Sequence, residues 1–366
     1  MRINDLAIEQ FRGIKYLRLK KLSDVNLLLG SNDAGKTSVL EAVKLLESPR
    51  DIDAIVRNSR IRFLNMGMPF YYDSCTQFGS FLDLFPFDQD ASKYISIGAE
   101  TDRASFQWIV KGETSHVLRP VSERELYGRQ SYRGKEERLI TEQDVLSFYG
   151  SIIFGAETIP IELDEFFRYQ AASSQAARMF GPIIYVAPGD HLSSRMLSSV
   201  FRASKRRERE IVELLRFVDP EIEGFKLKPN NMTNGTSQVI EHRRFGDIPL
   251  YTYGDGMKKI LALAANVVSA KNGILLIDEI ETSLQASNLE RIFNWLLQAC
   301  RRSNVQLFVT THSLEAVSAL VACAVRDDEC ELACYRLEKS LEQVYAKRFS
   351  ERDLDSLVNG RGIDVR

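Results

Sequence analysis

The sequence has few cysteines and no long apolar run. Five cysteines, at positions 75, 300, 323, 330 and 334, are scattered along 366 residues and form no CxxC pair. The last two have no histidine nearby, so reduced structural cysteines are favoured over a zinc site. No window approaches the roughly 18 uninterrupted apolar residues of a membrane-spanning helix, and the first residues do not form a signal peptide. We therefore expect a cytoplasmic protein without membrane contact.

The sequence also lacks an excess of either charge. The formal net charge is −2, from 48 Lys and Arg against 50 Asp and Glu residues, and 44% of residues are apolar. This balance excludes a general attraction to nucleic acid, so DNA binding would need a local basic patch. The run FRASKRRERE at residues 201–210 is either such a patch or a solvated helix face with interleaved glutamates. The length fits one large or two ordinary domains.

What the sequence does have is a phosphate-binding loop, GSNDAGKTS at residues 30–38, with the spacing Gly-x4-Gly-Lys-Thr. Glycines allow a tight turn in which backbone N–H groups point at phosphate oxygens. Lys36 supplies a positive charge to the β- and γ-phosphates, and Thr37 offers a hydroxyl to Mg²⁺. An apolar run at residues 25–29 predicts a buried strand before the loop, and apolar residues at helical spacing follow it. The predicted nucleotide-binding residues are Gly30, Ser31, Asn32, Asp33, Ala34, Gly35, Lys36, Thr37 and Ser38.

Two acidic residues end a second apolar strand, in NGILLIDEIETSL at residues 272–284. The carboxyl ends of parallel strands form the ligand-binding edge of a doubly wound sheet. Asp278 would hold Mg²⁺ through water beside Thr37, and Glu279 would polarise the water that attacks the γ-phosphate. Alone, the pattern also fits a buried strand that ends in a solvated turn. The phosphate loop favours the catalytic interpretation.

Two further features each have a functional and a structural interpretation. Gly254, Asp255 and Gly256 open a long apolar helix, and they form either a second anion site or a pair of packing glycines. This turn is more than 200 residues from the phosphate loop, and such a turn usually serves a nucleotide bound by another subunit. His312 ends the apolar stretch VQLFVTTHS, where an imidazole senses a γ-phosphate or is only structural. The order of the motifs favours the functional interpretation.

The remaining segments predict a mixed α and β architecture. Alternating residues predict strands at 3–11, 13–22, 92–100 and 103–112, and a short buried strand is expected at 182–188. Less regular segments are assigned as follows: irregular structure at 50–90, a mobile insertion at 119–145, a helix at 162–180, a helical arm at 190–217 and a loop or hairpin at 228–238.

Together, IEQFRGIKYLRL, GSNDAGKTSVLEAV, YGDGMKKILALA, GILLIDEIETSL and VTTHS resemble the ABC-type ATPases of the RecF, SMC and OLD (overcoming lysogenization defect) group. The chain looks closest to short bacterial AAA family ATPases near the OLD nucleases. The resemblance implies an α/β P-loop NTPase fold of the ABC-ATPase head type, a mixed sheet with a β-rich N-terminal lobe and a helical inserted arm. It implies one discontinuous domain with these parts: core at 1–49, 91–118, 181–190 and 240–366, insertions at 50–90 and 119–180, and a helical arm with a hairpin at 190–239.

The resemblance also implies roles for individual residues. Residues 30–37 would be the Walker A loop that binds ATP. Asp278 and Glu279 would be the Walker B pair, in which Glu279 is the catalytic base. His312 would be the switch histidine, and Arg12, in FRG, matches an arginine expected near the nucleotide.

The chain departs from the family pattern at three places. Residues 254–256 stand where the signature motif stands, but Gly254 replaces its serine, so γ-phosphate capture would rely on backbone N–H groups. Residues 283–284 occupy the D-loop, which reads SLQAS where many relatives have LHP. No glutamine is assigned to the Q-loop, for which Gln77 and Gln107 are candidates.

These features predict an Mg²⁺-dependent ATPase that forms a homodimer or higher oligomer around ATP. It would control an effector in DNA repair or anti-phage defence, with DNA as a candidate partner. About fifty residues follow His312, too few for a TOPRIM nuclease domain or a long coiled coil, so we expect a nuclease or toxin on a separate chain. The alternative is a slow-turnover, ATP-bound scaffold that holds such a partner inactive. An importer ATPase is disfavoured because no coupling Q-loop is found.

Overall fold

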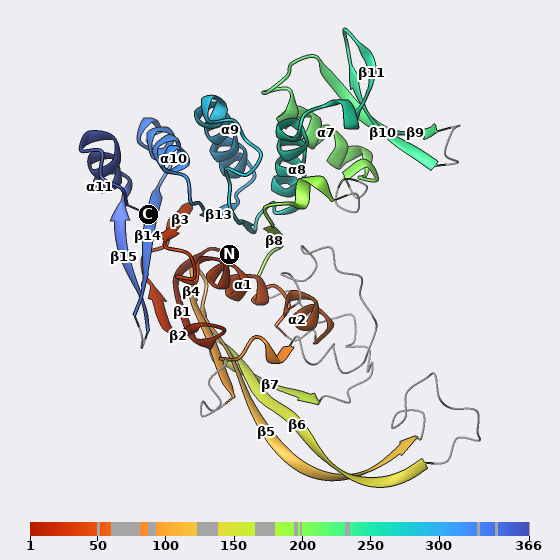
Figure 1. Cartoon of the computed structure of the whole chain (residues 1–366), viewed down its shortest axis with the longest axis vertical. Coiled ribbons are helices and arrows are strands. Elements are labelled where there is room, and N and C mark those ends of the chain that lie inside the picture. Colours follow the sequence, from red (N-terminus) through yellow and green to blue (C-terminus); the bar gives the residue numbers. More distant parts are fainter. Residues whose placement is uncertain are drawn as a thin grey trace.

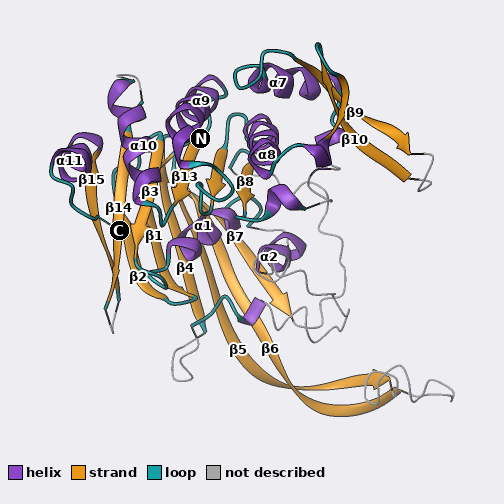
Figure 2. Ribbon diagram, turned by 45° about the horizontal axis from the view of Figure 1, so that its top comes forward, coloured by secondary structure: helices purple, strands orange, loops and turns teal. Residues whose placement is uncertain are grey.

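The structure is a computed structural model that describes residues 1–49, 52–59, 81–86, 93–122, 138–164, 180–193, 197, 200–230, 235–327, 330–340 and 343–365. Three sheets organise this part of the chain. A row of helices lies on one side of the central sheet, and a curved lobe of long strands extends on the other side (Figure 1). The same layers are visible from a second direction (Figure 2).

The central sheet has five parallel strands and one antiparallel edge strand, in the order β15-β14-β3-β13-β12-β8. Its inner strands are short apolar runs, because both faces of a parallel sheet are covered. The strands expected at 25–29 and 182–188, and those that end before Asp278 and near His312, are confirmed. The bounds are β3 Val25–Gly30, β8 Ile183–Val186, β12 Ile274–Ile277, β13 Gln306–Thr310, β14 Leu332–Lys339 and β15 Val344–Ser350.

Side chains that alternate along the central strands enter two separate cores. On β3, Leu27 and Leu29 face the core beneath the row of helices, whereas Leu28 faces the core shared with the β-rich lobe. The row of α8 to α11 covers the first face, with α7 packed against α8, and α1 covers the second. The helices are α1 Lys36–Leu45, α2 Ile52–Ser59, α7 Lys205–Leu215, α8 Asp255–Ser269, α9 Leu289–Arg302, α10 Leu314–Arg326 and α11 Glu351–Asp355.

The N-terminal lobe is an antiparallel sheet in the order β2-β1-β4-β5-β6-β7. Leu6 and Ile8 of β1 share a core with Val39 of α1, so the lobe packs directly on the helix that follows the phosphate loop. The antiparallel pair expected at 92–112 is confirmed by β4 and β5. The bounds are β1 Ile3–Phe11, β2 Ile14–Leu19, β4 Tyr94–Thr101, β5 Ser105–Ser122, β6 Arg138–Phe154 and β7 Glu157–Asp164.

A long hairpin replaces part of the mobile insertion expected at residues 119–145. β5 and β6 pair without interruption from Phe106 opposite Phe154 to Ser122 opposite Arg138, and they extend away from the body (Figure 1). The expectation was therefore wrong at both ends of the segment, and residues 123–137 lie outside the described residues. The polar sequence there lacks the apolar alternation by which a half-buried strand is recognised.

Two other local expectations were also wrong. The helix expected at 162–180 begins instead as strand, because β7 pairs with β6 as far as Asp164 opposite Ser147; residues 165–179 lie outside the described residues. The segment expected to be irregular contains the helix α2 at its start. In both places aromatic or polar residues obscure the period that distinguishes helix from strand.

α7 and a small sheet in the order β11-β10-β9 form the upper end of the molecule. The hairpin expected near residues 228–238 is confirmed by the β9–β10 pair. On α7, Lys205 pairs with Glu208 at 2.8 Å and Arg206 with Glu210 at 3.3 Å, which favours a solvated helix face over a phosphate-binding patch. The bounds are β9 Ile222–Asn230, β10 Gly235–His242 and β11 Gly246–Pro249.

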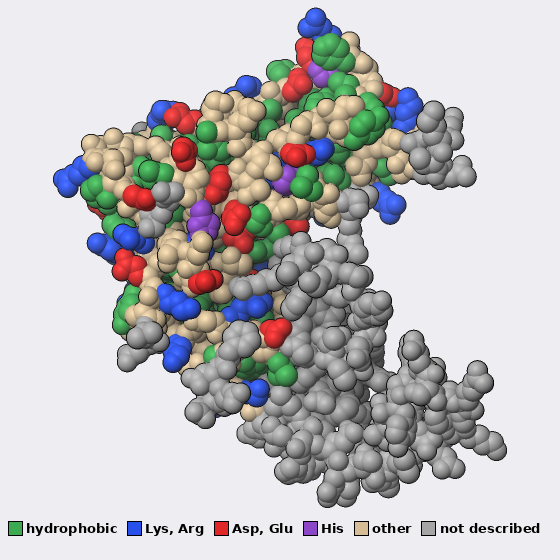
Figure 3. Space-filling model, in the orientation of Figure 1, with side chains coloured by type: hydrophobic (Ala, Val, Ile, Leu, Met, Phe, Trp, Pro, Cys, Tyr) green, Lys and Arg blue, Asp and Glu red, His purple; other side chains and the backbone are tan. Residues whose placement is uncertain are grey.

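Charges of both signs are interspersed over the body in the face shown by Figure 3. Among the described helices, none combines the length and apolar composition that crossing a bilayer requires.

Candidate nucleotide-binding site

The segments predicted to bind a nucleotide meet at one edge of the central sheet. In the parallel register, Leu27 of β3 lies beside Val309 of β13, which lies beside Ile277 of β12, which lies beside Val186 of β8. All four strands therefore end at the same edge. There the chain continues into the phosphate loop, the segment at 311–313, the acidic pair and the segment at 187–190.

The phosphate loop turns tightly between β3 and α1. Gly30, Asp33 and Gly35 have φ angles of 141°, 62° and 97°, in the region where glycine is favoured. A Cβ at Gly30 would lie 2.4 Å from the Leu337 carbonyl oxygen, so no other residue fits there without a backbone shift. Residues 31–33 are exposed. The loop thus presents its backbone to solvent at the start of a helix, as an anion site requires.

Lys36 lies over this loop rather than in solvent. Its Nζ donates to the carbonyl oxygens of Gly30 at 2.7 Å and Ser31 at 2.9 Å, and the residue is only 6% exposed. Burial lowers the pKa of Lys36, while Asp278 and Glu279 act against that shift. A buried ammonium bonded only to neutral carbonyls gains from a phosphate oxygen, so this setting fits a nucleotide.

The Asp278 carboxylate is held by three hydroxyl groups. Thr37 Oγ1 and Tyr185 Oη donate to its Oδ2 at 3.0 and 3.1 Å, and Thr310 Oγ1 donates to its Oδ1 at 2.5 Å. Thr37 and Asp278 are 241 residues apart in the chain. A hydroxyl and a carboxylate in contact are hard oxygen ligands, so this pair fits Mg²⁺ held mainly by phosphates. No larger cluster of His, Cys, Asp and Glu suited to a metal is found in the described part of the chain.

Glu279 follows in a constrained backbone conformation. Its φ of 48° lies in the left-handed region, which is uncommon for residues other than glycine. Its N–H donates to Thr310 Oγ1 at 2.9 Å, and Thr282 Oγ1 donates to its Oε2 at 3.4 Å. The Thr310 hydroxyl therefore joins both acidic residues and holds the turn that aims the Glu279 side chain.

A third acidic residue fixes the segment that contains His312. Glu281 Oε1 accepts from the N–H of His312 at 2.9 Å and of Ser313 at 3.2 Å. The His312 side chain is exposed at the strand end. The position of His312 thus depends on a residue that follows the acidic pair.

The Gly254 turn opens α8 at an exposed position. Gly254 is the N-cap of the helix, with Asp255 in the first turn paired to Lys258 at 3.0 Å. A Cβ at Gly256 would lie 3.4 Å from the Ser283 carbonyl oxygen, so the turn lies beside the 283–284 segment. Gly254, Asp255 and Ser283 are exposed there.

Two other candidates lie apart from this surface. Arg12 forms a buried ion pair, with its Nε 2.7 Å from Glu41 Oε2 on α1, so its contact with a nucleotide stays a prediction. Gln107, a Q-loop candidate, lies in the N-terminal lobe and donates to Ser96 Oγ at 3.1 Å. Gln77 lies outside the described residues.

Two family models and several known proteins are similar to this chain. A family model described as "AAA ATPase domain" matches residues 1–101, and one described as "AAA domain, putative AbiEii toxin, Type IV TA system" matches residues 163–318. An ATP/GTP phosphatase of Helicobacter pylori is 19% identical over 336 residues, 87% of each chain. An uncharacterised protein of Methanocaldococcus jannaschii is 32% identical over 113 residues, 31% of this chain and 98% of that protein.

Of two further similarities, one is in sequence and covers only part of the chain, and the other is in fold. The DNA replication and repair protein RecF of Stenotrophomonas maltophilia is 40% identical over 62 residues, 17% of each chain. The SMC head domain from Thermotoga maritima shares the fold, with a TM-score of 0.50 and 12% identity over 95% of this chain and 99% of that one. This chain belongs to the ABC-type ATPases related to RecF and SMC proteins.

Three contacts of this ABC-type ATPase were missed by sequence reasoning. Tyr185 is the one hydroxyl in the apolar run PIIYVAP, Thr310 ends β13, and Glu281 follows Asp278 by three positions. A polar side chain at the end of a buried strand was the available signal. In the sequence analysis, this signal was applied only to the acidic pair and to His312.

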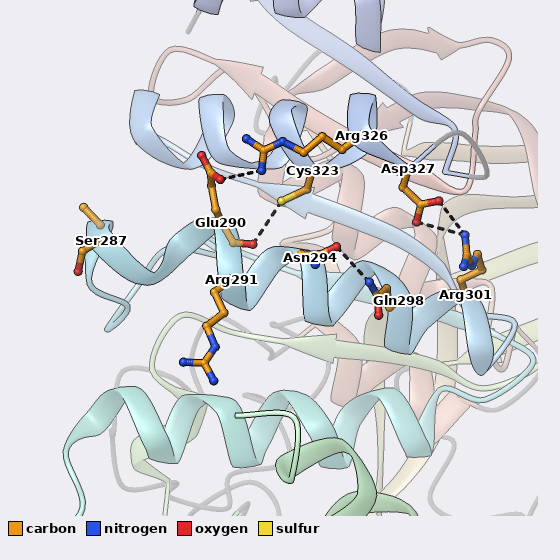
Figure 4. A pocket seen from close by; sticks show the side chains of 10 residues that line it. Ser287, Glu290, Arg291, Asn294, Gln298, Arg301, Cys323, Arg326 and Asp327 are labelled. Atoms are coloured by element: carbon orange, nitrogen blue, oxygen red, sulfur yellow. Dashed lines mark hydrogen bonds and ion pairs between the residues drawn. The ribbon is translucent and has the colours of Figure 1, made fainter. Parts of the chain in front are cut away.

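A separate pocket of about 710 Å³ lies between α9 and α10 of the ATPase (Figure 4). Two of its arginines pair with acidic residues: Arg326 lies 2.9 Å from Glu290, and Arg301 lies 2.8 Å from Asp327. The third, Arg291, donates to two backbone carbonyl oxygens. The pocket is therefore no substitute for the phosphate loop as an anion site.

We expect Thr310→Val to destabilise the ATPase by about 1–3 kcal/mol, because it leaves the buried Asp278 oxygen and the Glu279 N–H without their shared partner. Thr311→Val is the matched control, since Thr311 is equally buried but Ser313 N–H keeps Glu281 as an acceptor. Denaturant unfolding measures both variants. Equal destabilisation of the two would contradict the role given to Thr310.

Proposed function

We propose that this ATPase binds Mg-ATP at the edge of the central sheet, hydrolyses it, and dimerises around it. The observation that carries the proposal is the 3.0 Å contact between Thr37 and Asp278, which joins the phosphate loop to the acidic pair. Similarity to an ATP/GTP phosphatase supports hydrolysis of a nucleoside triphosphate.

Each residue would have a defined task at the phosphates. The loop N–H groups and Lys36 would bind the β- and γ-phosphates. Thr37 and Asp278 would hold Mg²⁺, which supplies neutralisation of phosphate charge. Glu279 would accept a proton from the attacking water, and His312 would contact the γ-phosphate from the end of β13.

A second subunit would complete the site. The Gly254 turn is a helix N-terminus exposed to solvent, and N-termini favour negative charge. A γ-phosphate held by another copy would supply that charge. Because each copy offers both surfaces, a two-fold arrangement forms two equal sites.

We further propose that the dimer controls a separate effector chain in DNA repair or anti-phage defence, in the cytoplasm. Similarity to RecF, a replication and repair protein, supports the first setting. The description of one matching family model names a putative toxin, which supports a nuclease or toxin as the effector. A pull-down of the Glu279→Gln protein with ATP, followed by identification of co-eluting chains and nucleic acid, tests this part.

The test of dimerisation is the mass of the Glu279→Gln protein by light scattering. We expect a larger or tighter assembly in Mg-ATP than in ADP. Adding Gly256→Asp should prevent it, because a carboxylate would oppose the incoming phosphate, whereas Gly256→Ala, the matched control, adds a Cβ at a tolerable 3.4 Å from Ser283. ATP binding to the isolated subunit should persist in both.

A mass that stays monomeric in ATP, in ADP and without nucleotide would reject the dimer. Equal assembly of the Asp and Ala variants would reject the role of the turn. If a dimer is present without nucleotide, the Asp variant should lose hydrolysis while it retains binding.

A further inference from the structure

A buried lysine on α8 has no hydrogen-bond partner. Lys259 is 0% exposed, and no acceptor in the described residues lies within hydrogen-bond distance of its Nζ. It sits five residues after Gly254, among core residues such as Ile260 and Leu261. Buried ammonium groups are normally paired, because loss of hydration is costly. An unpaired one calls for a functional explanation.

The surroundings of Lys259 are acidic. Burial lowers its pKa to about 8, and Asp190 and then Glu281 do most to oppose that shift, followed by Glu279 and Asp278. The short helix η1, Asp190–Leu192, packs against α8 and brings Asp190 to this place. Asp190 already accepts from the Ala187 N–H at 2.8 Å.

His191 completes the cluster on the η1 side. It is 1% exposed, and its pKa is lowered by burial and then by the charge of Lys259. A neutral imidazole adds no positive charge beside the ammonium. The Lys259 ammonium is therefore influenced by carboxylates of both η1 and the segment after β12, and Lys36 is a second cation near the latter.

Glu281 has a carboxylate oxygen without a donor, just as Lys259 has an ammonium group without an acceptor. Glu281 Oε1 holds the N–H groups of His312 and Ser313, but its Oε2 is buried and has no partner. A buried cation and a buried carboxylate oxygen, both without a hydrogen-bond partner, thus influence each other through their charges. The first turn of α8 lies against residues 283–284, just past Glu281, so a shift of α8 along that segment would bring the two groups together. Gly254 and Lys259 belong to the same helix, so a displacement of the Gly254 turn also displaces Lys259.

We propose that Lys259 is a positioning residue: when the Gly254 turn closes on ATP, the Lys259 ammonium pairs with Glu281 Oε2 and fixes the segment that carries His312. This inference rests on the proposed dimer. It makes hydrolysis dependent on closure, because the acidic pair and His312 reach their working arrangement only when α8 is engaged.

The test compares Lys259→Met, Lys259→Arg and Lys271→Met. Lys259→Met should lower kcat by about 3- to 30-fold, the range typical of residues that couple two sites, and leave the Kd for ATP unchanged. Lys259→Arg should restore most of the rate because it keeps the charge. Lys271, which lies past the far end of α8 with its side chain 47% exposed, is the matched control and should show wild-type kcat.

Thermal stability separates positioning from a structural role. The Met variant should melt at or above the wild-type temperature, since it removes an unpaired buried charge. Lys259→Met combined with Glu281→Gln should lower kcat no further than Glu281→Gln alone, because the two groups act as a pair.

Unchanged kcat in Lys259→Met, additive effects in the double variant, or a lower melting temperature would each overturn the inference. Absence of ATP hydrolysis and of ATP-dependent assembly in the wild type would instead reject the proposed function. The two failures are therefore distinguishable.

Discussion

Glu279→Gln is expected to slow ATP hydrolysis by about 10²–10⁴-fold, the usual loss when a general base is removed. The amide keeps the shape of the carboxylate but cannot accept the proton of the attacking water. Binding should persist, because Lys36 and the loop N–H groups are unchanged. The hydrogen bond from the backbone N–H of residue 279 to Thr310 Oγ1 holds this turn in both proteins.

Single-turnover hydrolysis, with and without DNA, measures this effect. Glu290→Gln is the matched control, since Glu290 lies exposed on α9 and pairs with Arg326. Turnover of Glu279→Gln at the wild-type rate would show that Glu279 is only structural. A low wild-type rate that DNA does not raise would favour the ATP-bound scaffold over the hydrolysing switch.

Lys36→Ala is expected to weaken ATP binding by about 2–5 kcal/mol, or roughly 30- to 5,000-fold in Kd. The ammonium lies in an enclosed place, where its contact with a phosphate is poorly screened. In the described structure its partners are two carbonyl oxygens of the loop. Alanine removes the charge and leaves the loop glycines in place.

Calorimetric titration with ATP measures the loss. Lys44→Ala, on the same helix, is the control: Lys44 pairs with Glu47 at 2.5 Å, two turns beyond the loop, and should leave the Kd near its wild-type value. Unchanged affinity in Lys36→Ala would defeat the assignment of the phosphate loop.

Those parts of the fold could be predicted from the sequence in which the structure depends on residues that are adjacent in the chain. The apolar run before Gly30 and the helix after Thr37 could be predicted because burial and turn chemistry act on adjacent residues. The outer part of the β5–β6 hairpin was missed, because its polar strands lack apolar alternation. Its pairing is fixed by a partner strand rather than by either strand's own sequence.

In the candidate site, too, local motifs could be predicted and contacts between distant residues could not. The phosphate loop and the acidic pair could be located from sequence because their spacing is itself the signal. The hydrogen bond from Tyr185 to Asp278 joins residues 93 positions apart, and that from Thr310 joins residues 32 apart. No periodicity encodes such contacts, and only the order of strands in the sheet brings them together. Lys259 was read as part of a helix, because its burial depends on η1 packing against α8.

The strand order also sets when this protein can acquire its site during synthesis. Both neighbours of β3 in the sheet, β13 and β14, lie about 280 residues or more further along the chain. At typical translation speeds the ribosome needs roughly 15–60 s to make that length. Throughout that time the apolar strand VNLLLG lacks its partners in the central sheet, so its unpaired apolar surface is a risk for aggregation. ATP therefore cannot assist the early steps of folding, because its pocket is among the last parts to form.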